Sequence, residues 1–187
     1  ANKLDVETYR SVYHDSLGRL YGAANLCKSD VIVKVLGNYP LVDPWEIDKL
    51  VQQFIESKSL YGTNEHYEGI ILGLGVEIVK FDLLERANKE VIKPFSRRLG
   101  TNYFPDIIEQ SEILKFKYTH TRPDYRVSIA VPSDILIVED IIKKAKSLDY
   151  QGIIECIDKN PILMNYARQN IAGPRETGVE KIILFPQ

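Results

Sequence analysis

The chain has 187 residues, of which 44% are apolar and 27% are charged, enough of each for one sizeable core and a solvated surface. Its net charge of −2 argues against non-specific nucleic-acid binding as the main activity, because that activity needs a strong positive field. The longest apolar run, Ile70 to Val76, is far shorter than the roughly 20 residues of a membrane span, so no membrane partner is predicted.

The cellular compartment is inferred from the amino terminus and the cysteines. The first residues are polar and lack the apolar stretch of a secretory signal. Cys27 and Cys156 are far apart and lie in apolar-leaning contexts, which favours two reduced, buried thiols over a disulfide scaffold. A cytoplasmic location is therefore expected.

The amino-terminal half is predicted to be mainly helical. Apolar residues from Val6 to Ala24 recur at helical spacing and predict one helix of about five turns. The segment Asp30 to Leu36 fits either a short strand or a continued helix. At Asp43, an acidic N-cap followed by proline marks the start of a helix that is expected to end near Gly62.

Two alternatives remain open for the next segment. Apolar residues repeat with helical period from Ile71 to Val91, which fits one helix of about 30 residues that is capped by Thr63 or Asn64 and extends to Pro94. The same residues also fit a strand at 69–74 followed by a helix. Residues 96–113 lack a sustained period and are interpreted as a connecting region with one short helical turn near Ile107.

The carboxyl-terminal part is predicted to alternate strands and helices. Helices are expected after Ser133 or Asp134 and after Asn160-Pro161. The expected strands are Ile113 to Thr119, Tyr125 to Val131, Gly152 to Ile157 and Val179 to Phe185. The fold class is therefore α/β (or α+β), with a helical amino-terminal half packed on a mixed sheet and a carboxyl-terminal βαβαβ unit. One domain, 1–187, is expected, with a subdivision into a mainly helical 1–100 and an α/β 113–187 as the alternative.

Two strand-to-helix junctions are candidate sites for an anionic ligand. In open parallel sheets, ligands bind beyond the carboxyl ends of strands, where helix amino termini present free N–H groups. Ser133 follows one predicted strand, and Asp158, Lys159 and Asn160 follow another. The alternative is that these residues only cap helices.

Basic residues around the strand Ile113 to Thr119 form a second candidate surface. Lys115 and Lys117 share one face of that strand, and His120 and Arg122 follow. Basic groups interleaved with aromatic rings can bind a nucleotide or single-stranded nucleic acid. The alternative is a solvated strand face, so a nucleic-acid partner is not favoured.

Signatures of catalysis are missing from the sequence. The histidines are scattered away from any metal-ligand spacing, and no Gly-x-Ser-x-Gly motif occurs, so no metal site or hydrolase nucleophile is predicted. The segment Ile153 to Ile171 resembles the second strand and following helix of class I methyltransferases, in which an acidic residue at the strand end holds a ribose. The glycine-rich loop of that family has no counterpart at Val131 to Asp134, so the family is not assigned.

Three functional hypotheses follow. The leading one is a non-catalytic binding or regulatory protein that recognises a small anionic ligand, such as a nucleotide, or a protein partner. The second is an enzyme acting on a nucleotide or cofactor, such as a transferase, with Asp158 or His120 as its polar group and no cofactor identified. The third is a structural subunit that forms a homo-oligomer through exposed apolar helices.

Overall fold

The structure, a computed structural model, describes residues 6–65, 70–116 and 121–169. The predicted strand Val179 to Phe185 and two candidate ligand residues, Lys117 and His120, lie outside these ranges. The described residues form eight α-helices and a four-stranded sheet, which confirms the α/β class. No helix in this part of the chain is long and apolar enough to cross a membrane.

The chain divides into two compact units, and each unit combines three separate stretches. Unit 1 contains residues 1–34, 54–62 and 77–114, and unit 2 contains residues 35–53, 63–76 and 115–187. Each unit has its own hydrophobic core. Because the stretches alternate along the chain, the units do not correspond to an amino-terminal and a carboxyl-terminal half.

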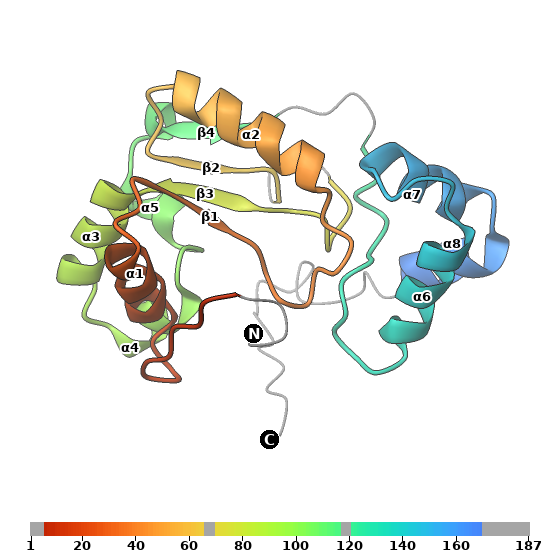
Figure 1. The fold of residues 1–187 in the computed structure, drawn as a ribbon, viewed down its shortest axis with the longest axis horizontal. Helices are drawn as coiled ribbons and strands as arrows, with labels where there is room; N and C mark the ends of the chain where they lie inside the picture. Colours follow the sequence, from red (N-terminus) through yellow and green to blue (C-terminus); the bar gives the residue numbers. More distant parts are fainter. Residues whose placement is uncertain (1–5, 66–69, 117–120, 170–187) are drawn as a thin grey trace. The chain divides into compact units, whose positions relative to one another are not determined.

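The sheet belongs almost entirely to unit 1. Its strands are β1 (Val31–Lys34), β2 (Tyr61–Thr63), β3 (Glu77–Lys80) and β4 (Ile113–Lys115), in the spatial order β1-β3-β2-β4 (Figure 1). β1 and β3 are antiparallel, with Val31 opposite Lys80 and Lys34 opposite Glu77. The ambiguous segment after Asp30 is thus a strand. The single long helix proposed for Ile71 to Val91 is wrong, because β3 interrupts it.

Four helices accompany the sheet in unit 1 (Figure 1): α1 (Ser16–Leu26), α3 (Phe81–Glu90), α4 (Pro94–Leu99) and α5 (Phe104–Ile107). α1 starts about ten residues later than predicted, because the Asp15 carboxylate caps it by accepting a 2.8 Å hydrogen bond from the Gly18 N–H. The core that these elements bury comprises Leu17, Ala24, Ile32, Tyr61, Val79, Leu83, Leu84, Ala87, Phe104 and Ile113.

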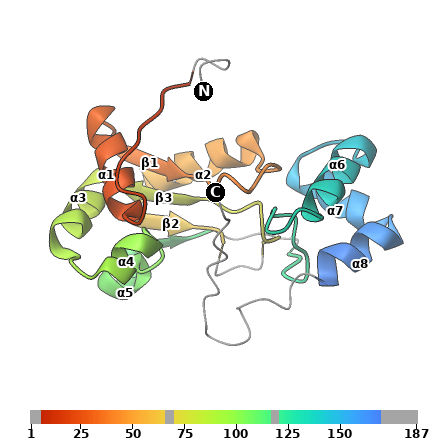
Figure 2. The ribbon, with the colours of Figure 1, turned by 90° about the horizontal axis from the view of Figure 1, so that it is seen from below.

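Three helices pack against one another in unit 2: α6 (Asp134–Lys144), α7 (Tyr150–Asp158) and α8 (Pro161–Gln169), grouped in Figure 2. α2 (Pro44–Glu56) begins where its cap predicts, with the Asp43 carboxylate 2.9 Å from the Trp45 N–H. The helices predicted after Ser133 and after Asn160 are confirmed as α6 and α8. The core of unit 2 includes Leu41, Ile70, Ile71, Leu74, Tyr125, Val127, Ile137, Val138, Ile141, Ile153, Ile154, Ile157, Leu163 and Ala167.

The strand predicted at Gly152 to Ile157 is wrong, because this segment is helix α7. Asp149 caps the helix through a 2.7 Å bond from the Gly152 N–H, and the isoleucines of the segment are buried along one helical face. The strand predicted at Tyr125 to Val131 is also absent, apart from one isolated parallel bridge between Arg126 and Leu72. The predicted series of parallel strands is therefore not what organises this part of the chain.

Next to that bridge, the backbone at Gly73 passes close to the backbone at Ser128. Gly73 has φ of 111°, and a Cβ atom at this position would lie 2.4 Å from the Ser128 backbone nitrogen. Only glycine adopts this φ without strain and leaves room for the neighbouring chain. Gly73 thus allows the two segments to pass within van der Waals distance.

Candidate functional site

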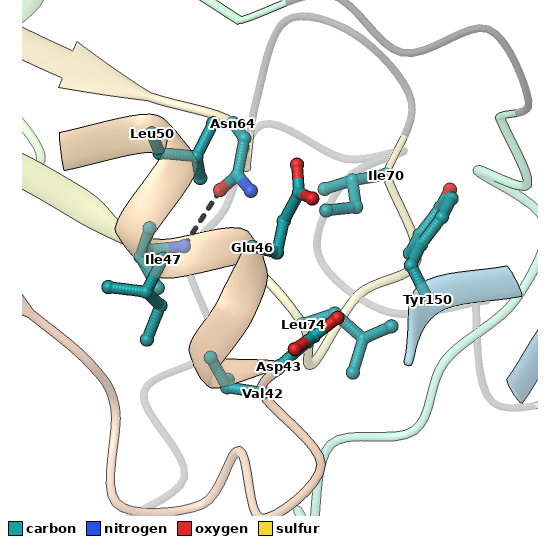
Figure 3. A pocket seen from close by; sticks show the side chains of 10 residues that line it. Val42, Asp43, Glu46, Ile47, Leu50, Asn64, Ile70, Leu74 and Tyr150 are labelled. Atoms are coloured by element: carbon teal, nitrogen blue, oxygen red, sulfur yellow. Dashed lines mark hydrogen bonds between the residues drawn. The ribbon is translucent and has the colours of Figure 1, made fainter. Parts of the chain in front are cut away.

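A small pocket in unit 2 lies beside the amino-terminal half of α2 (Figure 3). Four of its side chains are polar, namely Asp43, Glu46, Asn64 and Tyr150. Its apolar wall is formed by Val42, Ile47, Leu50, Ile70, Leu74 and Val76. The pocket has room for about one water-sized group in its interior and opens to solvent.

The chemistry of the pocket favours groups that donate hydrogen bonds. Asp43 and Glu46 are carboxylates, and none of the ten lining residues is basic. The Lys49 ammonium lies 3.4 Å from Glu46 and balances part of this charge. The remaining negative charge disfavours a phosphate, whereas a hydroxyl or ammonium group would be attracted. This site can therefore hold one donor group of a ligand and is too small to enclose a nucleotide.

Hydrogen bonds and burial fix two of the polar groups. The Asn64 Oδ1 atom accepts a 2.7 Å bond from the Val76 N–H, which is the dashed line in Figure 3. Burial raises the pKa of the Tyr150 hydroxyl, and the negative charge of Glu46 adds to the shift. Tyr150 is therefore a neutral hydroxyl at physiological pH.

A second polar group, which we name the Glu77 cluster, lies within unit 1 and consists of Lys34, Tyr61, Glu77 and Thr101. The Tyr61 hydroxyl donates to the Glu77 Oε1 atom at 2.5 Å, and the Thr101 Oγ1 atom lies 2.8 Å from each carboxylate oxygen. The Lys34 ammonium forms an ion pair with Glu77 and donates to Thr101 Oγ1 at 2.6 Å. Side chains from β1 and β2 and the side chain of Thr101 thus converge on the Glu77 carboxylate of β3.

The Glu77 carboxylate remains charged despite its burial. Its residue is only 3% exposed. Burial acts to raise the pKa of Glu77, but the charge of Lys34 and the hydrogen bonds from Lys34, Tyr61 and Thr101 outweigh it and leave the pKa lowered. The cluster is therefore a stable ion pair, with the carboxylate inside and the 20%-exposed lysine side chain outside.

Two of the predicted ligand residues, Arg122 and Asp158, lie together in the structure. They belong to a group that we name the Arg122 cluster, which also contains Asp124, Tyr125 and Arg168. Arg122 forms ion pairs with Asp124 and Asp158 and lies 3.7 Å from the centre of the Tyr125 ring. Arg168 pairs with Asp124 at 3.1 Å, and the Tyr125 hydroxyl donates to Asp158 at 2.5 Å. The hydrogen bond to Asp124 raises the pKa of Arg122, which stays charged. Two arginines thus neutralise two aspartates, and little positive charge is left for an anion.

Lys159 and Asn160 lie at the end of α7, not at the end of a strand. Lys159 pairs with Glu155 at 2.9 Å, and the Asn160 side chain donates to the Cys156 carbonyl. A helix carboxyl terminus carries partial negative charge, so it disfavours the anion that was expected there. The strand expected before these residues is therefore absent, whereas the amino terminus of α8 does follow Asn160, and the role of Asp158, Lys159 and Asn160 in binding stays a prediction.

The remaining predicted residues are apart from these clusters. Ser133 is the N-cap residue of α6, and its side chain makes no capping hydrogen bond. The buried Asp134 side chain instead accepts from the Ala130 and Val131 N–H groups, which precede the helix, and pairs with Arg126 at 2.7 Å. Lys115 is the exposed last residue of β4. None of the predicted ligand residues that the structure describes lines the pocket.

Sequence reasoning missed both the pocket and the Glu77 cluster. Asp43 was interpreted only as the N-cap of α2, although Glu46 in the first turn places a second carboxylate close to it in sequence. Lys34, Tyr61, Glu77 and Thr101 come from distant parts of the chain, and no local pattern joins them.

Cys27 and Cys156 are both free thiols, but Cys27 is exposed and not buried as expected. Within the described ranges, no group of three or more His, Cys, Asp or Glu side chains could hold a metal ion.

Comparison with known proteins places the chain among its relatives. No family model matches it. An uncharacterized protein of Methanocaldococcus jannaschii is 31% identical over 172 residues, which are 88% of this chain and 68% of that protein. The chain belongs to the same family as this archaeal protein. The activity of that relative is not stated by its name, so the family itself identifies no reaction.

A solved structure supplies the functional comparison. A cytidylyltransferase from Leptospira borgpetersenii matches with a TM-score of 0.81 and 25% identity, over 90% of this chain and 71% of that one. Its α/β fold agrees with the class found here. The likeness favours the alternative of an enzyme acting on a nucleotide over the leading hypothesis of a non-catalytic binding protein.

Proposed function

We propose that this protein is a nucleotidyltransferase that transfers a cytidylyl group from cytidine triphosphate to an acceptor. The supporting observation is the likeness to the Leptospira cytidylyltransferase, which extends over 90% of the chain at a TM-score of 0.81. In such a transfer, an acceptor oxygen forms a bond to the α-phosphorus, the bond to the β-phosphate breaks and pyrophosphate leaves. The acceptor proton passes to solvent or to a basic group.

The α2 pocket is suited to a donor group of the acceptor and not to the triphosphate. The carboxylates of Asp43 and Glu46 attract hydroxyl or ammonium groups and repel phosphate, while the apolar wall packs against carbon. This assignment would give the triphosphate and the acceptor different binding surfaces, as a transfer between two substrates requires.

The test measures pyrophosphate release by the full-length protein with each of the four ribonucleoside triphosphates, Mg²⁺ and a panel of hydroxylated and aminated acceptors. We expect release with cytidine triphosphate in the presence of an acceptor. Cytidine triphosphate binding in calorimetry without turnover on any acceptor would instead support a non-catalytic binding protein. Absence of both binding and turnover would contradict the proposal.

The pocket assignment is tested with Glu46→Gln, for which Asp48→Asn on an exposed position of the same helix is the matched control. Loss of one charged hydrogen-bond acceptor should raise the KM for the acceptor roughly tenfold and leave the KM for cytidine triphosphate unchanged. Equal acceptor KM values in the two variants would show that the pocket does not bind the acceptor.

A further inference from the structure

The cation of the Glu77 cluster is the Lys34 ammonium, which Glu77 and Thr101 hold in place. Glu77 and Thr101 accept two of the three hydrogen bonds that the Lys34 ammonium can donate. The third hydrogen is not used by either of these two acceptors. The Lys34 side chain is 20% exposed, so part of this side chain contacts solvent.

The ion pair is oriented with its positive end outward. The Glu77 side chain is 3% exposed, compared with 20% for Lys34, so the lysine is the more accessible partner of the pair. The carboxylate behind it reduces the net charge but also fixes the position of the ammonium nitrogen. A lysine held in this way binds a phosphate oxygen as a point charge without first losing side-chain freedom.

The position of Lys34 in the fold agrees with a ligand site. Lys34 is the last residue of β1, which is an edge strand of the sheet, and the chain continues into a loop through residues 35–43. Binding residues are concentrated where a rigid element opens into a loop. A buried ion pair is also costly to form, and apolar residues of similar volume stabilise a fold equally well. Stability alone therefore does not account for the pair.

We propose that Lys34, positioned by Glu77 and Thr101, binds a phosphate group of the nucleotide substrate. This inference rests on the proposed nucleotidyl transfer and adds to it the residue that contacts the phosphates. Lys34 is the binding residue, whereas Glu77 and Thr101 act only through it.

The first experiment measures binding of cytidine triphosphate, pyrophosphate and cytidine to the full-length protein by calorimetry. Lys34→Met removes the charge, and Lys80→Met at the other end of the same strand pair is the matched control. A lost charge-assisted hydrogen bond should weaken binding of cytidine triphosphate and pyrophosphate about tenfold to a hundredfold. Cytidine has no phosphate, so its affinity should not change.

Two further variants separate binding from folding. Lys34→Met leaves the Glu77 carboxylate buried without its partner, which destabilises the fold. The double variant Lys34→Met/Glu77→Gln removes both charges and should regain thermal stability while its affinity for pyrophosphate stays low. Lys34→Arg, which keeps the charge, should recover part of the affinity. If the double variant regains full affinity together with stability, the cluster is purely structural and the inference is wrong.

The outcomes distinguish this inference from the proposed function. Wild-type turnover of cytidine triphosphate together with unchanged affinity in Lys34→Met would overturn the inference alone. Lys34-dependent pyrophosphate binding without binding or turnover of cytidine triphosphate would overturn the cytidylyl specificity and retain Lys34 as a phosphate ligand. Absence of all binding in the wild type would overturn both.

Discussion

At the scale of single residues, the hydroxyl group of Tyr103 is expected to destabilise the folded state. Its hydroxyl is buried without a hydrogen-bond partner among the described residues, while its ring packs edge-on against Phe104 at 5.3 Å. Burial raises the pKa of Tyr103 to about 12, so the group is an uncharged hydroxyl that has lost its hydration.

Tyr103→Phe should therefore stabilise the protein by about 1 kcal/mol, since the ring contact is kept and the unsatisfied hydroxyl is removed. Urea unfolding measures the change. Tyr125→Phe is the opposite control, because the Tyr125 hydroxyl donates to Asp158 and its removal should cost about 1 kcal/mol. Equal destabilisation in both variants would mean that the Tyr103 hydroxyl is satisfied in solution.

Asp15 links stability to pH. Burial acts to raise the pKa of Asp15, but hydrogen bonds from Arg97 and the Gly18 N–H outweigh it, and the net pKa is lowered. A carboxylate with a lowered folded-state pKa contributes stability above its unfolded pKa of about 3.9. That contribution is lost as pH falls through the folded-state value.

Asp15→Asn keeps an oxygen that can cap Gly18 but loses the charge that faces Arg97 at 2.8 Å. We expect it to be about 1 kcal/mol less stable than wild type at pH 7 and equally stable near pH 2. Unfolding in urea at pH 7, 5, 3 and 2 gives the profile. Asp140→Asn, at a half-exposed carboxylate paired with Lys144, should show no measurable loss. A stability difference independent of pH would show that the Asp15 charge is not responsible.

At the scale of elements, the crossing at Gly73 depends on a single missing side chain. Its φ of 111° and the 2.4 Å approach of the Ser128 nitrogen leave no space for a methyl group. Gly73→Ala should destabilise the protein by roughly 3 kcal/mol through combined backbone strain and overpacking. Gly37→Ala is the control, because no atom lies within 4 Å of its added Cβ. Similar unfolding midpoints for the two variants would contradict the close crossing.

The starts of α2 and α8 were predictable because their signals are local. An N-cap and a proline at Asp43-Pro44 and at Asn160-Pro161 fix the first turn wherever the rest of the chain lies, and α2 and α8 begin there. The α7 segment was mistaken for a strand because its isoleucines favour β-structure. The Asp149 cap and the four-residue spacing of Glu155 and Lys159 were the opposing helical signals.

The candidate sites were less predictable than the helices because they depend on pairing between distant segments. The β1–β3 register places Lys34 opposite Glu77, and a slip of one residue would put Val33 there. Glu77 itself lay within a segment with helical periodicity, so its strand was not foreseen. The predicted Arg122 and Asp158 do meet, but each neutralises the other, a result that only the three-dimensional structure reveals.

At the scale of the whole molecule, two hydrophobic cores are built from interleaved stretches of one chain. When β1 pairs with β3 in unit 1, the chain between them is closed into a loop. This loop contains residues 35–53 and 63–76, which belong to unit 2. Closing such loops links the conformational entropy of one unit to the order of the other. We therefore predict that the protein unfolds as one domain, despite its two cores.

Native-state amide hydrogen exchange tests this prediction, because the most protected amides of α3 and α7 report the opening of each core separately. Leu84→Ala removes a fully buried side chain from unit 1, and Ile141→Ala does the same in unit 2. Each substitution should lower the free energy of unfolding by about 3 kcal/mol. If unfolding is cooperative, either variant lowers the protection of both helices by the same amount. Loss of protection confined to α3 in Leu84→Ala, and to α7 in Ile141→Ala, would instead mean that the two units open independently and that one domain is the wrong description.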